Sequence, residues 1–148
     1  MEWNRASKAA KLAAYGMAAV FAAVGIIFLV APGGVIAFFN TLSIPLGLRP
    51  APVSGVSLYS ALAAAYMYVV TFLAWNMARR PDADIFPRLL VHAKLASAIV
   101  SLGLFAVGRP YLILLANGII DGGIGVAVEV WFRRGRGAGP AGGPGRRA

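Results

Sequence analysis

Cysteine is absent from this chain of 148 residues, and acidic residues are scarce. Without a thiol the chain has no disulfide, no thiolate metal site and no thiol redox centre. Only 5 Asp and Glu residues oppose 14 Lys and Arg, and charged residues together make up 13% of the sequence. Soluble domains carry about a quarter charged residues, whereas 59% of this chain is hydrophobic. These shortages exclude an ordinary soluble domain and indicate a membrane protein.

Four apolar stretches use most of the length. They run approximately over residues 12–30, 56–77, 89–107 and 111–132. A helix rises about 1.5 Å per residue, so about 20 residues cross the hydrocarbon core of a bilayer. We therefore predict an all-α, polytopic membrane protein, a four-transmembrane-helix bundle that forms one domain over residues 1–134. Residues 135–148 are only Gly, Ala, Pro and Arg, which predicts a disordered basic cytoplasmic tail.

Basic residues gather on alternate connections of this bundle. Three groups flank the spans on one side: Arg5, Lys8 and Lys11; Arg79, Arg80 and Arg88; Arg133, Arg134, Arg136, Arg146 and Arg147. The other two connections carry only Arg49 and Arg109. Cytoplasmic loops hold the Lys and Arg excess, so both termini are predicted to be cytoplasmic. The net charge of +9 then reflects topology, and we expect no nucleic-acid partner. Richness in Ala, Gly, Arg and Pro indicates a GC-rich genome and hence a bacterium. We therefore expect a bacterial inner membrane.

The first outside connection is the longest one. The segment from Gly33 to Phe39 is too apolar for a solvated loop and too short to span, which predicts a short helix lying at the outer interface. The following Pro45, Pro50 and Pro52 favour an extended return to the second span. An inert interfacial cap and a binding lid are both compatible with this pattern.

Ionisable residues at bilayer depth are functional hypotheses by default, and the third and fourth spans contain them. On the fourth span, Asn117, Asp121 and Glu129 lie on one helical face. On the third span, Lys94, Ser97 and Ser101 also share a face. Because only 108–110 joins these two spans, they must form an antiparallel hairpin. Neither polar face is tolerable against lipid, so the two faces should meet.

Counting residues outward from Arg109 predicts the pairs. Asp121 and Ser97 are each twelve residues from it, and Lys94 is fifteen residues away, about 4–5 Å deeper. We therefore predict an ion pair of Lys94 with Asp121, assisted by Ser97 and Asn117. A second pair, Glu129 with Arg133 at i+4, is predicted at the inner interface. The buried pair is either a structural pair that fixes the hairpin register or a proton or substrate site of a transporter.

Other residues support weaker interpretations. In the first span Ala14, Ala18 and Ala22 recur every four residues, which is typical of a tightly packed bundle helix or of a contact face for a partner. Tyr66 and Tyr68 fall mid-membrane, and at least one hydroxyl should face the bundle for a partner. A lone His92 falls short of the two axial ligands that haem needs in a helical bundle. We expect no catalytic, metal or cofactor site.

Four spans in so short a chain are also typical of small multidrug transporters. Those proteins carry an essential acid in the first span, where this chain has only Ala, Gly and larger apolar residues. Three hypotheses remain. The favoured one is a non-catalytic accessory or scaffold subunit that contacts lipid and other membrane subunits, or its own copies, through Ala/Gly-rich helix faces. The alternatives are a small ion-coupled transporter or channel, and an intramembrane enzyme or redox carrier.

Overall fold

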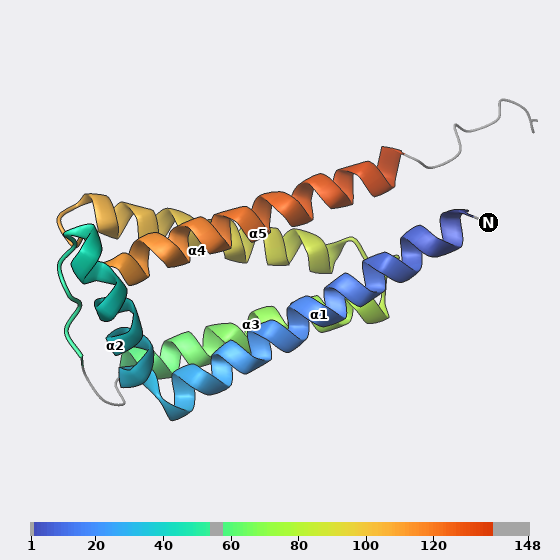
Figure 1. Ribbon diagram of the computed structural model, residues 1–148. Helices are drawn as coiled ribbons and strands as arrows, with labels where there is room; N and C mark the ends of the chain where they lie inside the picture. Colours follow the sequence, from blue (N-terminus) through green and yellow to red (C-terminus); the bar gives the residue numbers. More distant parts are fainter. Residues whose placement is uncertain (1, 54–57, 138–148) are drawn as a thin grey trace, which may run out of the picture.

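The computed structural model describes residues 2–53 and 58–137, and the described chain is all-α. Its elements are α1 (Glu2–Val30), α2 (Pro32–Ser43), the 3-10 helix η1 (Ile44–Leu46), α3 (Leu58–Arg79), α4 (Ile85–Ala106) and α5 (Leu112–Gly137). Each of α1, α3, α4 and α5 is long and apolar enough to cross a membrane. The predicted fold class, four membrane-spanning helices with one short apolar helix in the first connection, is confirmed (Figure 1).

The helices extend beyond the predicted apolar stretches. The first begins at Glu2 rather than near residue 12, the third span begins at Ile85, and the last helix continues to Gly137. Hydropathy detects only the part of a helix that crosses hydrocarbon, and a helix can continue into the polar interface with its backbone bonds intact. Most of the predicted tail, residues 138–148, lies outside the described residues.

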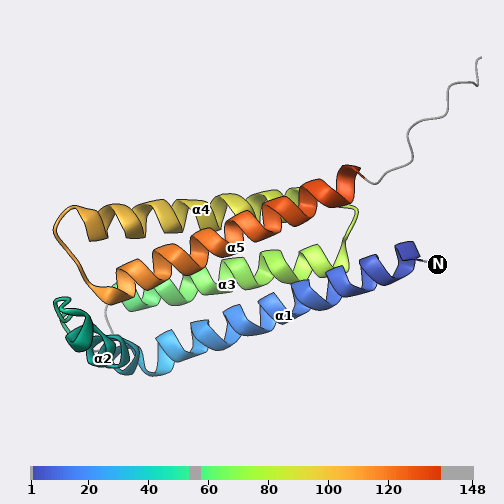
Figure 2. The ribbon, with the colours of Figure 1, turned by 45° about the horizontal axis from the view of Figure 1, so that its top comes forward.

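The four long helices form two antiparallel pairs. α1 packs along α3, and α4 packs along α5, whereas the main contact between the pairs is the weaker one of α3 with α4. Figures 1 and 2 show both pairs side by side, with the start of α1 and the end of α5 at the same end of the molecule. We call this end the basic end; Lys8, Lys11, Arg79, Arg80, Arg88, Arg133 and Arg134 lie toward it.

Small residues allow close contact within each pair. A Cβ at Gly25 of α1 would lie 2.9 Å from Met67 Cβ of α3, and Ala14 and Ala18 are buried in the same contact face. In α5, a Cβ at Gly118 would lie 2.5 Å from Leu102 Cγ of α4. Without a hydrophobic drive between helices in lipid, this close approach is a main source of association. The small stripe of the first span thus packs inside the bundle.

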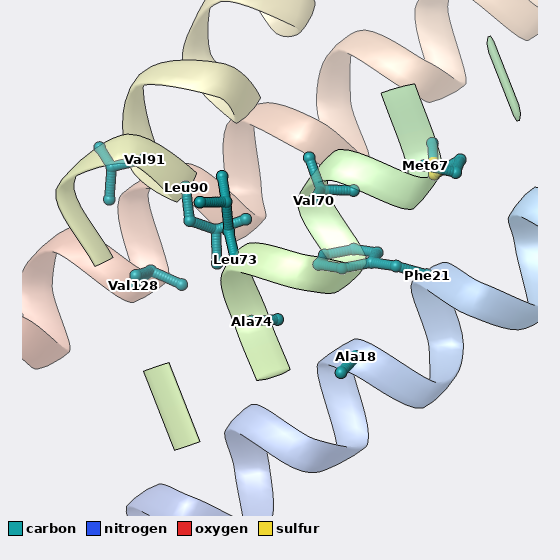
Figure 3. Close-up of a cluster of buried hydrophobic side chains, with 9 residues drawn as sticks. All are labelled: Ala18, Phe21, Met67, Val70, Leu73, Ala74, Leu90, Val91 and Val128. Atoms are coloured by element: carbon teal, nitrogen blue, oxygen red, sulfur yellow. The ribbon is translucent and has the colours of Figure 1, made fainter. Parts of the chain in front are cut away.

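Apolar side chains from all four long helices meet between the pairs (Figure 3). Phe21 of α1, Val70 of α3, Leu90 of α4 and Val128 of α5 each contribute to this buried cluster. The cluster lies toward the basic end, beside the buried polar groups described below. It joins the two pairs, whose helices contact each other less than the helices within each pair do.

The short helix α2 lies at the end opposite the basic end and contacts α1 and the nearby part of α5 (Figures 1 and 2). Asn40 closes the connection, because its Nδ2 donates to the Ala51 carbonyl at 2.8 Å and its Oδ1 accepts from the Ala51 N–H at 2.7 Å. The chain turns at Gly47, whose φ of 65° lies in the left-handed region that glycine favours. Phe38 on this short apolar helix is 60% exposed.

Candidate functional site

The central polar feature joins the two helices of the second pair. Lys94 Nζ of α4 donates to Asp121 Oδ1 of α5 at 2.7 Å. Their side chains are 1% and 4% exposed, so both charges are removed from the surroundings of the protein. Removing either partner of a buried ion pair would leave an uncompensated charge in the interior. The arrangement therefore holds a neutralised pair rather than a free charge.

Aromatic residues of the helix pair α1 and α3 cover the Lys94 ammonium. Lys94 Nζ lies 4.4 Å from the centroid of the Phe21 ring of α1 and 5.2 Å from that of Tyr66 of α3. Both distances are within the range of a cation–π interaction, which strengthens when the cation is desolvated. All four long helices thus converge on one ammonium group. Sequence reasoning did not find Phe21, because a single Phe in an apolar span carries no signal of its own.

Tyr66 makes a second contact with the same region. Its hydroxyl donates to the backbone carbonyl of Ala93 at 3.0 Å, next to Lys94 in α4. Tyr68, two residues later, is 71% exposed. The prediction that at least one of the mid-membrane tyrosines faces the bundle is confirmed. This hydrogen bond ties α3 to α4 at the level of the ion pair.

One of the two carboxylate oxygens of Asp121 makes no hydrogen bond to the described residues. Asp121 Oδ2 is buried and has no hydrogen-bond partner among the described residues. A buried polar atom without a partner is costly. This oxygen can therefore accept a further hydrogen bond.

Asn117, Ser97 and Ser101 form a separate polar cluster one turn further from the basic end. The Asn117 amide Nδ2 donates to Ser101 Oγ at 2.8 Å and to Ser97 Oγ at 3.2 Å. The expectation that Asn117 and Ser97 assist the ion pair is thus replaced by a more local arrangement. An amide offers two donor hydrogens, and the two serine hydroxyls lie one turn apart on the facing helix.

The second predicted ion pair lies near the basic end. Arg133 Nε donates to Glu129 Oε1 at 2.5 Å within one turn of α5. The side chains are 77% and 32% exposed. His92 is also exposed and faces a groove that it shares with this pair. In the part of the chain that the structure describes, no three His, Cys, Asp or Glu residues gather as metal ligands would.

Comparison of this chain with protein-family models, with curated proteins and with solved structures found no match. Function is therefore argued from the residues and their geometry. The fold is that of a small multi-pass membrane protein. Its polar interior includes the enclosed ion pair, the amide–hydroxyl cluster and the Tyr66 hydrogen bond to Ala93.

Proposed function

We propose that this protein is a non-catalytic accessory or scaffold subunit of a larger complex in a bacterial inner membrane, with both termini cytoplasmic. The observation that carries the proposal is a second small-residue face on α1. Ala9, Ala13, Gly16 and Ala23 share this face with the larger Val20, and all five are exposed. The face lies opposite Ala14 and Ala18, which pack against α3.

This outer face permits another helix to approach closely. A Cβ added at Gly16 would meet no atom of the described residues within 4 Å. Small residues gain little from contact with lipid, but they let two helix backbones pack tightly. A partner subunit or a second copy of this chain fits such a face.

The enclosed ion pair is consistent with a structural role. A transport site needs access from both sides of the membrane, whereas Lys94 is 1% exposed and its ammonium is covered by two aromatic rings. An ion pair that joins two helices fixes their register. The charge distribution, with most basic residues at one end of the bundle, supports the proposed orientation.

The test is extraction of the natively expressed protein in a gentle detergent after in-cell crosslinking, followed by mass spectrometry of the crosslinked species. Gly16→Leu should abolish a specific crosslinked complex, because the larger side chain blocks close approach to α1. Gly103→Leu is the matched control. Gly103 is also exposed and open, but it lies on α4, away from the proposed contact face of α1.

A complex that is lost in Gly16→Leu and retained in Gly103→Leu supports the proposal, and its mass distinguishes another subunit from a second copy. A wild-type protein that remains a lone monomer after crosslinking overturns it. Equal loss in both variants also overturns it, since the effect would not be specific to α1.

A second candidate function is that of a small ion-coupled transporter. It is favoured by Asp121 Oδ2, the carboxylate oxygen outside the ion pair. A buried carboxylate atom that lacks a partner among the described residues is suited to bind and release a proton. In proteoliposomes with an imposed proton gradient, this candidate requires that Asp121→Asn abolish proton-coupled flux in protein that remains folded by circular dichroism and gel filtration. A variant that fails to assemble would instead indicate a structural role for the pair. Flux that survives in Asp121→Asn excludes this candidate.

A further inference from the structure

A groove opens between α4 and α5 at the basic end. Its volume is about 600 Å³, and it is lined by Arg88, Val91, His92, Leu95, Glu129, Phe132 and Arg133. Arg88 and His92 are exposed on one side, and Arg133 is exposed on the other. The groove therefore opens toward the surroundings of the bundle and is separate from the enclosed ion pair.

Polar and apolar groups are graded along this groove. On α4, Arg88 lies nearest the helix start, Val91 and His92 follow one turn later, and Leu95 follows after a further turn. At 1.5 Å per residue, Leu95 lies about 10 Å deeper than Arg88. On the antiparallel α5, Phe132 and Arg133 lie nearest the basic end, and Glu129 lies about one turn deeper. The rim thus carries an arginine from each helix, and the deeper wall on α4 is apolar.

The groove carries a surplus of positive charge. Two guanidinium groups oppose one carboxylate, and Glu129 is already paired with Arg133 through the Nε–H. A guanidinium has five N–H donors, so the remaining donors of Arg133 can serve an anion. Arginine suits phosphate in particular, because its planar fork matches two phosphate oxygens.

We propose that this groove binds an anionic phospholipid. Its phosphate contacts Arg88 and Arg133 at the rim, and one acyl chain lies along Val91, Leu95 and Phe132. A free phosphate would need only the cationic rim, whereas the deeper apolar wall matches a hydrocarbon chain. The groove also begins where α4 starts to cross the membrane, which is the depth at which a phospholipid changes from headgroup to acyl chain.

The test is native mass spectrometry of the purified full-length protein in non-ionic detergent, titrated with dioleoyl phosphatidylglycerol. The dissociation constant of the first bound lipid is the quantity compared. Arg88→Gln should weaken this binding about fivefold, as expected for one basic residue at an anionic lipid surface. Arg80→Gln is the matched control, because it removes the same charge from the same end but does not line the groove.

A third variant should act in the opposite direction. Glu129→Gln removes the negative charge from the groove and releases the Nε–H of Arg133. Binding of phosphatidylglycerol should therefore tighten severalfold. A general loss of folding cannot mimic this result, since an unfolded variant does not bind lipid more tightly.

Two further titrations identify the ligand. Dioleoyl phosphatidylcholine, which has the same chains and no net charge, should bind more weakly and be insensitive to Arg88→Gln. Inorganic phosphate should not displace phosphatidylglycerol, because it does not use the apolar wall. Equal weakening in Arg88→Gln and Arg80→Gln, Arg88-independent binding or displacement by inorganic phosphate would each overturn the proposal.

Discussion

Two ion pairs, each with an acid on α5, show how differently this protein uses charge. Lys94 and Asp121 join α4 to α5 with side chains that are 1% and 4% exposed. Glu129 and Arg133 lie one turn apart on α5 with side chains that are 32% and 77% exposed. The distances are similar, 2.7 Å and 2.5 Å. The two pairs therefore differ mainly in environment.

The environment decides what each pair contributes. An exposed pair is screened by water and salt, and its net effect on stability is about 0–1 kcal/mol. A buried pair offsets a large desolvation cost, so removing one partner leaves a costly uncompensated charge. We therefore expect the buried pair to determine whether α4 and α5 assemble in one register, and the exposed pair to have little effect on folding.

The largest expected effect comes from breaking the buried pair. Lys94→Met should lower the free energy of unfolding by about 3 kcal/mol, because Asp121 stays buried without its cation. The measurement is reversible unfolding in mixed detergent micelles. Lys94→Met combined with Asp121→Leu should recover most of that loss, since neither charge remains. A double variant as unstable as Lys94→Met would contradict this account.

The aromatic cover of the ammonium should give the next largest effect. Phe21→Leu should cost about 1–2 kcal/mol, through lost ring area and a lost cation–π contact. In the Lys94→Met background the cost should shrink, because the cation is gone. Phe72→Leu is the control, since Phe72 is 52% exposed on α3. A Phe21→Leu cost that is independent of Lys94 would show that the ring contributes only packing.

The uncharged cluster of Asn117, Ser97 and Ser101 is a neutral case that can be compared with the two ion pairs. Asn117→Ala removes both hydrogen bonds to Ser97 and Ser101 and should cost about 1 kcal/mol, the range measured for interhelical hydrogen bonds in membranes. Adding Ser101→Ala to Asn117→Ala should cost little more, because the shared bond is already lost. Additive costs in the double variant would argue against this cluster.

The exposed pair should give the smallest effect. Glu129→Gln should change the free energy of unfolding by about 0.5 kcal/mol or less. In about 1 M KCl this difference should vanish, because the Debye length falls to about 3 Å. The cost of Lys94→Met should persist in the same buffer. A salt-sensitive Lys94→Met cost would indicate that water reaches the buried pair.

Much of the fold could be predicted because each span carries its own signal. The four crossings follow from four apolar stretches near bilayer length, and the pairing of α4 with α5 follows from the short connection at Gly108–Pro110. The sequence predicted the ends of the helices less accurately. α1 begins at Glu2, since a helix needs no apolar residue once it has left the hydrocarbon.

The part of the candidate site that lies within the α4–α5 hairpin could be predicted from the sequence. Counting from Arg109 placed Lys94 within reach of Asp121, and the structure has Nζ 2.7 Å from Oδ1. The separation of these polar residues into an ion pair and an Asn117 cluster was not predicted, because it depends on one turn of helical offset between them. Such an offset depends on how side chains interlock between α4 and α5.

The amino-acid sequence alone determined that this is a multi-pass membrane protein with four helices long and apolar enough to cross, and where along those helices its charged residues lie. Tertiary structure decided that α1 lies against α3, and that Phe21 and Tyr66 cover the Lys94 ammonium. It also decided that a charged groove forms between α4 and α5. Hydropathy and periodicity describe the faces of one helix, whereas the choice of neighbour depends on the shapes of two surfaces together.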